Sequence, residues 1–212
     1  MAGLFWNTVD PALQAILADV MTEPFFEPFR LVGGTALSLQ LGHRKSVDID
    51  LFTDALYGSI DFDFIDTWFR ARYAYVSQPT AGPIAFGHSY FIGEDAQHAV
   101  KIDIYYTDPF IRAPLHLDGI RMASTEEITA MKVNVIQRGG RKKDFWDIHE
   151  LHDTFSIAEM IAFHAERYPY EHDEQKIRRQ FTNFATADDD FDPNCIRGKY
   201  WELIKLDLLE ML

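Results

Sequence analysis

The sequence predicts an α+β protein, in which a mixed β-sheet flanked by helices is followed by a C-terminal helical bundle. Two observations lead to this prediction. Short runs with strand-like alternation are mixed with amphipathic segments up to residue 123, whereas the segments from residue 124 onward have helical spacing. We therefore divide the chain into an α/β core, residues 1–123, and a helical region, residues 124–212, and expect the two to pack as one structural unit.

Local signals place the elements of the α/β core. Asp10 followed by Pro11 is typical of an N-cap and the first helical position, and apolar residues recur at helical spacing after it. Alternating apolar and polar residues predict strands, two of which form a hairpin around Gly93. The expected helices are 11–22, 35–41 and 61–73, and the expected strands are 29–32, 47–52, 85–92, 98–106 and 120–123.

The helical region begins with a capping signal. Ser124 followed by Glu127 is the pattern of a capping box, and it predicts a helix that runs to about Gln137. Gly139 and Gly140 then interrupt the helical pattern. Four more helices are expected, at residues 142–153, 157–168, 173–185 and 198–212.

The overall charge limits the classes of function. The chain has 212 residues and a formal net charge of -13, which opposes a simple electrostatic nucleic-acid binder. Basic residues nevertheless cluster at positions 44–45 and 138–143. A locally basic opening on an otherwise acidic protein could hold a nucleoside triphosphate (NTP) and one end of an RNA. These residues are Arg44, Lys45, Arg138, Arg141, Lys142 and Lys143.

The composition also indicates a compartment. No apolar run approaches the ~18 residues needed to cross a bilayer, and the N-terminus lacks the features of a signal peptide. Cys195 is the single cysteine, so an internal disulfide is excluded. We therefore expect a cytoplasmic protein without a membrane partner.

A double glycine followed by paired aspartates is the most informative segment. Gly33 and Gly34 precede an expected helix, whose free N-terminal amides favour phosphate. Asp48 and Asp50 alternate along a strand, so they face the same side, as ligands of Mg²⁺ would. Ser46 shares this face if the strand begins early. Taken alone, such a pair of aspartates is more often a solvated strand face.

Asp103 strengthens the metal-site interpretation. It lies among apolar residues of a second expected strand, where a carboxylate is costly unless it is paired or bound to metal. If this strand neighbours the first, three carboxylates converge. Such a group around two metal ions is suited to phosphoryl or nucleotidyl transfer.

Together these segments resemble the nucleotidyltransferase superfamily. More narrowly, they are similar to the AbiEii/AbiGii family, nucleotidyltransferase-like toxins of abortive-infection (type IV) toxin–antitoxin systems. The resemblance covers about residues 29–153. It rests on residues 33–37 (Gly-Gly-Thr-Ala-Leu), residues 44–52, residues 101–103, and a helical Lys…Arg…Lys-Asp-x-x-Asp pattern within residues 127–148.

The resemblance implies catalytic and metal-binding roles. Asp48 and Asp50 would bind Mg²⁺ or Mn²⁺, and Asp103 would complete this site and serve as general base toward the acceptor. Asp144 and Asp147 fall on the fourth motif, in which one aspartate is functionally important, and the sequence does not distinguish between them.

The resemblance also implies a nucleotide site and partners. Gly33 and Gly34, with Thr35 or Ser46, would contact the phosphates of an NTP, and Lys132 would neutralise the charge of the triphosphate. The acceptor would be an RNA such as tRNA, with toxicity through blocked translation, and a cognate antitoxin protein would be a partner. Two alternatives stay open: transfer to a small molecule such as an aminoglycoside or to a protein, and nucleotide binding without catalysis.

Overall fold

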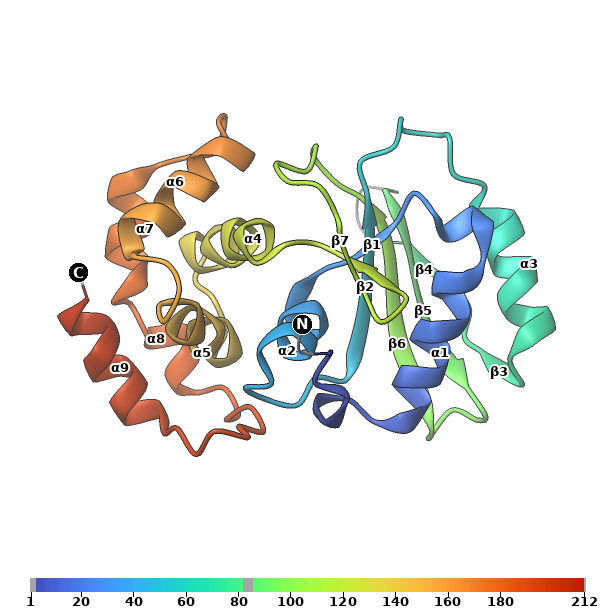
Figure 1. Ribbon diagram of the computed structural model, residues 1–212, viewed down its shortest axis with the longest axis horizontal. Helices are drawn as coiled ribbons and strands as arrows, with labels where there is room; N and C mark the ends of the chain where they lie inside the picture. Colours follow the sequence, from blue (N-terminus) through green and yellow to red (C-terminus); the bar gives the residue numbers. More distant parts are fainter. Residues whose placement is uncertain (1–2, 82–85, 212) are drawn as a thin grey trace.

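The computed structural model describes residues 3–81 and 86–211 (Figure 1). The beginning of the expected strand 85–92 and the end of the expected helix 198–212 lie outside these residues. Within the described residues the architecture is the predicted α+β fold: a mixed sheet with helices beside it, followed by a set of helices.

The sheet is built around a parallel pair of strands, β2 and β6. Strands β1 and β5 flank this pair, each antiparallel to its neighbour, so the order across the sheet is β3-β5-β6-β2-β1-β8-β7, with β4 also paired to β5. The strands are β1 (Arg30–Leu31), β2 (Asp48–Thr53), β3 (Tyr75–Val76), β4 (Thr80–Ala81), β5 (Gly87–Gly93), β6 (Ala99–Tyr106), β7 (Leu115–Leu117) and β8 (Ile120–Met122).

The helices lie on both sides of this sheet. In Figure 1, α1 and α3 lie on one side of the sheet, and α2 and the helices from α4 onward lie on the other. Two short 3-10 helices, η1 (Trp6–Thr8) and η2 (Pro24–Phe26), flank α1. The α-helices are α1 (Pro11–Thr22), α2 (Gly33–Leu41), α3 (Phe62–Arg72), α4 (Thr125–Gln137), α5 (Lys142–Leu151), α6 (Ile157–Arg167), α7 (Glu174–Phe181), α8 (Ala185–Asp188) and α9 (Trp201–Glu210).

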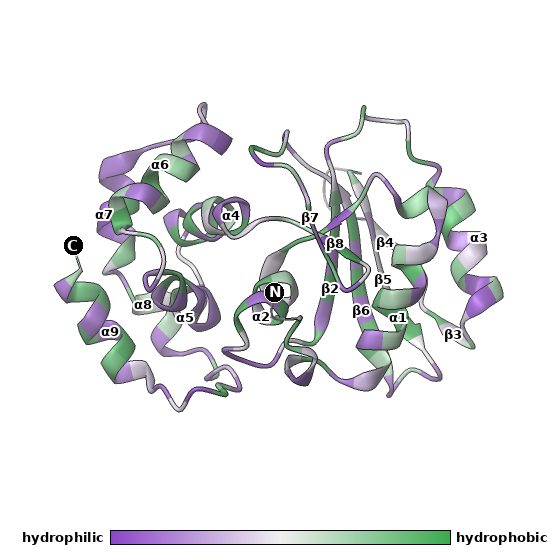
Figure 2. Cartoon of the chain, in the orientation of Figure 1, coloured by the Kyte–Doolittle hydropathy of each residue, from purple (hydrophilic) through white to green (hydrophobic). Residues whose placement is uncertain are grey.

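The two faces of the central strands differ in chemistry. Ile49 and Leu51 of β2 are fully buried in the core, whereas Asp48 and Asp50 alternate with them and remain partly exposed. Helix α1 covers the apolar face with residues such as Leu13 and Leu17. Figure 2 shows hydrophobic residues along α1 and the strands, and hydrophilic residues on outer turns of α3 and α6. The polar face of β2 is therefore left for the functional site.

The differences from the expected elements have physical causes. The expected helix 173–185 is two helices, α7 and α8, and the last helix begins at Trp201 rather than at 198. Before this helix, Cys195 forms an antiparallel bridge with Arg44, and the Lys45 amide donates to the Asn194 carbonyl at 2.8 Å. Strands β3, β4 and β7 have only two or three residues, too few to show a period.

A buried ion pair joins the helical region to the sheet. The Arg167 guanidinium, at the end of α6, pairs with the fully buried Glu127 of α4. It also donates to the Thr107 hydroxyl at 2.9 Å and the Pro109 carbonyl at 3.0 Å, both just after β6. These contacts cross the expected boundary at residue 123, and the division into two parts remains a prediction. No helix within residues 3–81 and 86–211 is long and apolar enough to cross a membrane.

We expect Arg167→Leu to lower the free energy of unfolding by about 3–5 kcal/mol, because it leaves the Glu127 carboxylate buried without its counter-charge. Urea denaturation followed by circular dichroism measures the change. Arg178→Leu is the matched control, since Arg178 pairs with Glu174 at 2.9 Å on an exposed surface, and it should change stability by less than about 0.5 kcal/mol. Equal losses in the two variants would contradict this assignment.

Candidate active site

The double glycine lies where β1 passes into α2. The helix begins directly at Gly33, two residues before the predicted start, and Gly33 has a φ of 68°, in the left-handed region that favours glycine. A Cβ atom on Gly33 would overlap the Asp50 carboxylate, and one on Gly34 would lie 2.5 Å from an Arg44 guanidinium nitrogen. Glycine at both positions therefore lets the backbone approach charged side chains closely.

The parallel register of β2 and β6 brings the predicted carboxylates together. Asp50 lies opposite Asp103, and Asp48 lies opposite Lys101. All four side chains project from the same face, because residues paired in a ladder share a face. The Lys101 ammonium contacts one Asp103 oxygen at 2.5 Å, and the other Asp103 oxygen, Oδ1, is buried with no hydrogen-bond partner among the described residues.

The electrostatics of Asp50 show how crowded this face is. Burial, together with the negative charges of Asp103 and Asp48, raises the pKa of Asp50 to about 6. Lys132 and Lys101 act in the opposite direction, but less strongly. The face thus has an excess of negative charge that a bound cation would relieve.

The residues present fit a hard divalent cation. Carboxylate oxygens are its preferred ligands, and the unpartnered Oδ1 of Asp103 and the raised pKa of Asp50 both mark unmet demand for positive charge. In the described part of the chain, however, no three His, Cys, Asp or Glu side chains are already arranged to hold a metal ion.

The opposite wall comes from the helical region. Lys132 of α4 is buried, and its ammonium lies 2.7 Å from carboxylate oxygens of both Asp144 and Asp147 on α5. Because these two carboxylates hold the charge, the pKa of Lys132 is raised in spite of its burial, which alone would lower it. The predicted lysine and both predicted aspartates therefore form one cluster.

The two aspartates of the fourth motif have different surroundings. Asp147 is fully buried; Arg44 contacts both of its oxygens, at 2.7 and 2.8 Å, and His43 contacts one at 2.8 Å. Asp144 lines the pocket, and its Oδ2 accepts from the Arg141 amide at 3.0 Å at the start of α5. The contacts of Asp147 are those of an anchor, and Asp144 is the one that faces the cavity.

Ser46 and Thr35 also differ. Ser46 lines the pocket, whereas Thr35 is almost fully buried. The Thr35 hydroxyl contacts the Ser46 hydroxyl at 2.8 Å and the backbone carbonyl of Asp48. A hydroxyl with these partners orients the strand and Ser46. The phosphate contact of Thr35 therefore stays a prediction, and the buried position of its side chain does not favour it.

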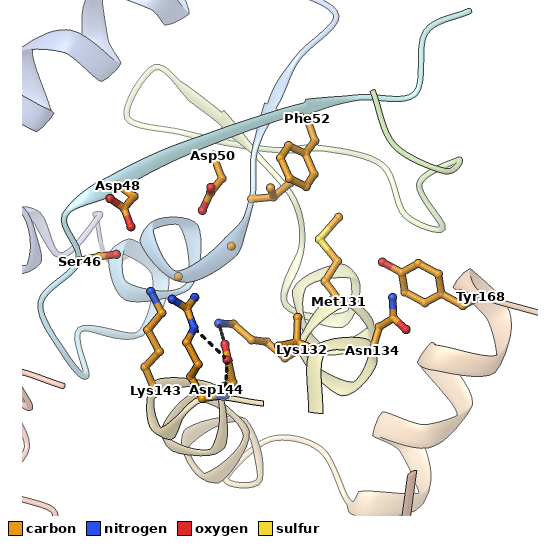
Figure 3. A pocket seen from close by; sticks show the side chains of 15 residues that line it. Ser46, Asp48, Asp50, Phe52, Met131, Lys132, Asn134, Lys143, Asp144 and Tyr168 are labelled. Carbon is orange, nitrogen blue, oxygen red and sulfur yellow. Dashed lines mark hydrogen bonds and ion pairs between the residues drawn. The ribbon is translucent and has the colours of Figure 1, made fainter. Parts of the chain in front are cut away.

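These residues surround one cavity of about 260 Å³ between β2 and the helices (Figure 3). Seven of the predicted residues line it: Gly33, Gly34, Ser46, Asp48, Asp50, Lys132 and Asp144. Asp103, Thr35 and Asp147 are not part of its lining, and they act on it through the contacts described above.

Sequence reasoning missed eight further lining residues: Val32, Phe52, Met131, Asn134, Val135, Arg141, Lys143 and Tyr168. Arg141 and Lys143 carried a signal, since both belong to the basic cluster recognised from the sequence. Burial and the neighbouring Arg141 lower the pKa of Lys143, and no carboxylate among the described residues forms an ion pair with it. Asn134 and Tyr168 gave no signal, because single polar residues on helices are most often solvated.

We expect Asp50→Asn to stabilise the metal-free protein by about 1–3 kcal/mol above pH 6. Folding raises the pKa of Asp50 from 3.8 to about 6, so the folded protein loses stability as the pH rises through this interval, and asparagine avoids the loss. The advantage should vanish below about pH 4, where both states are protonated. Thermal melts with EDTA at pH 4 and pH 7.5 measure it, and an equal difference at both pH values would refute the assignment.

Asp147→Asn should destabilise the protein more than Asp144→Asn. The first change leaves Arg44 without its carboxylate and should cost about 3–5 kcal/mol, whereas after the second Lys132 keeps Asp147, and the cost should be about 1–2 kcal/mol. Urea denaturation of both variants at pH 7.5 gives the two values, and the reverse ranking would contradict the anchor role of Asp147.

Comparisons with known proteins give a sequence relative, related folds and a family. An uncharacterized protein of Aquifex aeolicus (aq_aa25) is 33% identical over 137 residues, which are 62% of this chain; the chain spans 61% of the length of that relative. Two solved structures share the fold. A protein of H. pylori proposed to be a nucleotidyltransferase has a TM-score of 0.60 at 19% identity, with 94% of this chain and 89% of that one covered.

The second is MenT4, a nucleotidyltransferase toxin of Mycobacterium tuberculosis, with a TM-score of 0.51 at 13% identity and coverage of 94% and 84%. Likenesses at such low identity establish the fold alone. The family is established separately, because residues 15–208 match the family described as nucleotidyl transferase AbiEii toxin, Type IV TA system. The match confirms the family predicted from the motifs: the chain belongs to the AbiEii nucleotidyl transferase toxins of type IV toxin–antitoxin systems.

Proposed function

We propose that this nucleotidyltransferase depends on a divalent metal ion and transfers a nucleoside monophosphate from an NTP to an RNA acceptor, foremost tRNA. One observation carries the proposal: the cavity has carboxylates on its β2 wall and basic side chains on its helical wall. A metal–triphosphate complex carries positive and negative charge side by side, so it complements both walls.

The residues divide the work of binding. The amides at Gly33 and Gly34, with the Ser46 hydroxyl, contact the phosphates at the start of α2. Lys143, free of an ion-pair partner among the described residues, and Lys132, shared between two carboxylates, neutralise phosphate charge. Asp48, Asp50 and Asp103 would hold Mg²⁺ or Mn²⁺, which when bound would stabilise the charge that develops on the phosphates.

The transfer step requires one proton acceptor. A bond forms between the acceptor oxygen and the α-phosphorus as the bond from that phosphorus to the bridging oxygen breaks, and pyrophosphate leaves. The proton of the acceptor hydroxyl passes to Asp103, whose Oδ1 has no hydrogen-bond partner in the described structure. Asp103 lies opposite Asp50 in the ladder, and Asp50 lines the cavity.

The family membership supports the biological part of the proposal. A toxin of this kind would be opposed by a cognate antitoxin, and modification of a tRNA end would block translation. With a net charge of -13, RNA contacts would be confined to basic residues near the cavity, such as Arg138 and Arg141. The reducing cytoplasm, where tRNA is found, suits a chain whose single cysteine is free.

Incubation with each α-labelled NTP, Mg²⁺ and total tRNA tests the proposal. We expect label in tRNA with the wild type and at least about a hundredfold less with Asp48→Ala, since removing a group that acts in the transition state typically costs this much. Asp63→Ala is the matched control, because Asp63 is exposed on α3, on the other side of the sheet.

Parallel reactions contain an aminoglycoside or a protein extract in place of tRNA. Label in one of these alone would replace RNA by a small molecule or a protein as acceptor. NTP binding without label in any acceptor would favour a nucleotide-binding protein without catalysis. Label in tRNA that is unchanged by Asp48→Ala would refute the assignment of the site.

A further inference from the structure

The cavity is polarised along its length. Ser46, Asp48 and Lys143 lie at one end in Figure 3, and Phe52, Met131 and Tyr168 lie at the other. The first end suits phosphates and the second suits a flat, partly apolar group. If the proposed function holds, a nucleobase occupies the second end.

Asn134 is the polar side chain on α4 at the second end. In Figure 3 its amide nitrogen points toward the space between Met131 and Tyr168, and its oxygen points away. The oxygen, Oδ1, lies 3.3 Å from Nε2 of His164 on α6. The amide nitrogen has no hydrogen-bond partner among the described residues, so both of its hydrogens are available to a ligand.

His164 fixes this orientation from behind the cavity wall. It is fully buried, and its Nδ1 lies 2.9 Å from Nδ1 of His172. With Oδ1 of Asn134 facing the ring, His164 donates from Nε2, and its Nδ1 then accepts a hydrogen from His172. Burial and the neighbouring His172 lower the pKa of His164 to about 4, so the ring is neutral near pH 7.

Tyr168 supplies a second donor beside the first. Its hydroxyl oxygen accepts a hydrogen bond from Nε of Arg167 at 3.0 Å, so its own hydrogen is left for the cavity. In Figure 3 the hydroxyl points into the cavity. Burial raises the pKa of Tyr168, which keeps the hydroxyl protonated.

We propose that Asn134 and Tyr168 read the nucleobase of the NTP, with His164 as a positioning residue, and that they select bases with a ring carbonyl over adenine. This inference rests on the proposed function, since it needs an NTP in the cavity. Guanine offers the adjacent acceptors O6 and N7, and cytosine and uracil offer carbonyl oxygens. Adenine places its N6 amino group beside N7, so one protein donor would meet another donor.

Equilibrium binding of the Mg²⁺ complexes of ATP, GTP, CTP and UTP tests this selection. We expect at least one of GTP, CTP and UTP to bind the wild type about tenfold more tightly than ATP, the ratio that one additional hydrogen bond typically gives. Asn134→Leu and Tyr168→Phe should each reduce this ratio severalfold. Magnesium tripolyphosphate, which lacks a base, should bind all of these proteins equally.

The controls separate positioning from general damage. His164→Leu should reduce the ratio as Asn134→Leu does, whereas His164→Gln, which keeps a side-chain donor, should largely restore it. Asn183→Leu makes the same substitution as Asn134→Leu on an exposed residue after α7 and should leave the ratio unchanged. Thermal melts confirm that each variant is folded under the assay conditions.

The outcomes distinguish this inference from the proposed function. Tightest binding of ATP, a wild type that binds the four NTPs equally or binds none, or a ratio unchanged in Asn134→Leu, would overturn the base-reading role. Label could still be transferred to tRNA if ATP binds most tightly, if the four NTPs bind equally, or if the ratio is unchanged in Asn134→Leu. In these cases the proposed nucleotidyl transfer would survive. Selective binding without transfer would support base reading and count against the proposed reaction.

Discussion

The arrangement of the site depends on the fully buried carboxylate of Asp147. It binds Arg44 and His43, which follow α2, and Lys132, which lies on α4. Two segments, the one after α2 and helix α4, are thus tied to α5 by one side chain. Since the Arg44 guanidinium also packs against Gly34, the glycine turn has a fixed position relative to α4 and α5, and the cavity is the space left between them.

This network also determines which charges are free to meet a ligand. The charge of Arg44 is neutralised by Asp147. The ion pairs of Asp147 with Arg44 and Lys132 hold the pKa of its carboxyl well below its usual range. Lys132 is shared, whereas Lys143 reaches the cavity without an ion-pair partner in the part of the chain that is described. On the facing strands the carboxylates are in excess, as the raised pKa of Asp50 shows. Each wall therefore carries uncompensated charge of opposite sign.

The sequence predicted the half of the site that depends on strand geometry. Alternation places Asp48 and Asp50 on one face, and the register of β2 and β6 supplies the condition under which the embedded Asp103 joins them. Helix packing leaves no comparable periodic signal. The approach of Asn134 to His164 depends on how α4 packs on α6, and the role of Asp147 as an anchor depends on its distance from Arg44, more than a hundred residues earlier.

This division has a consequence for how the site can vary. The groups suited to the transfer step project from β2, β6 and the start of α2, which are held by backbone ladders and by close contact with glycine. The groups suited to the base are Asn134 on α4 and Tyr168 directly after α6, and they depend on His164 and Arg167, respectively, for their orientation. A substitution behind the helical wall can change which base fits without moving a carboxylate, because the two halves meet mainly through the anchored cluster around Asp147.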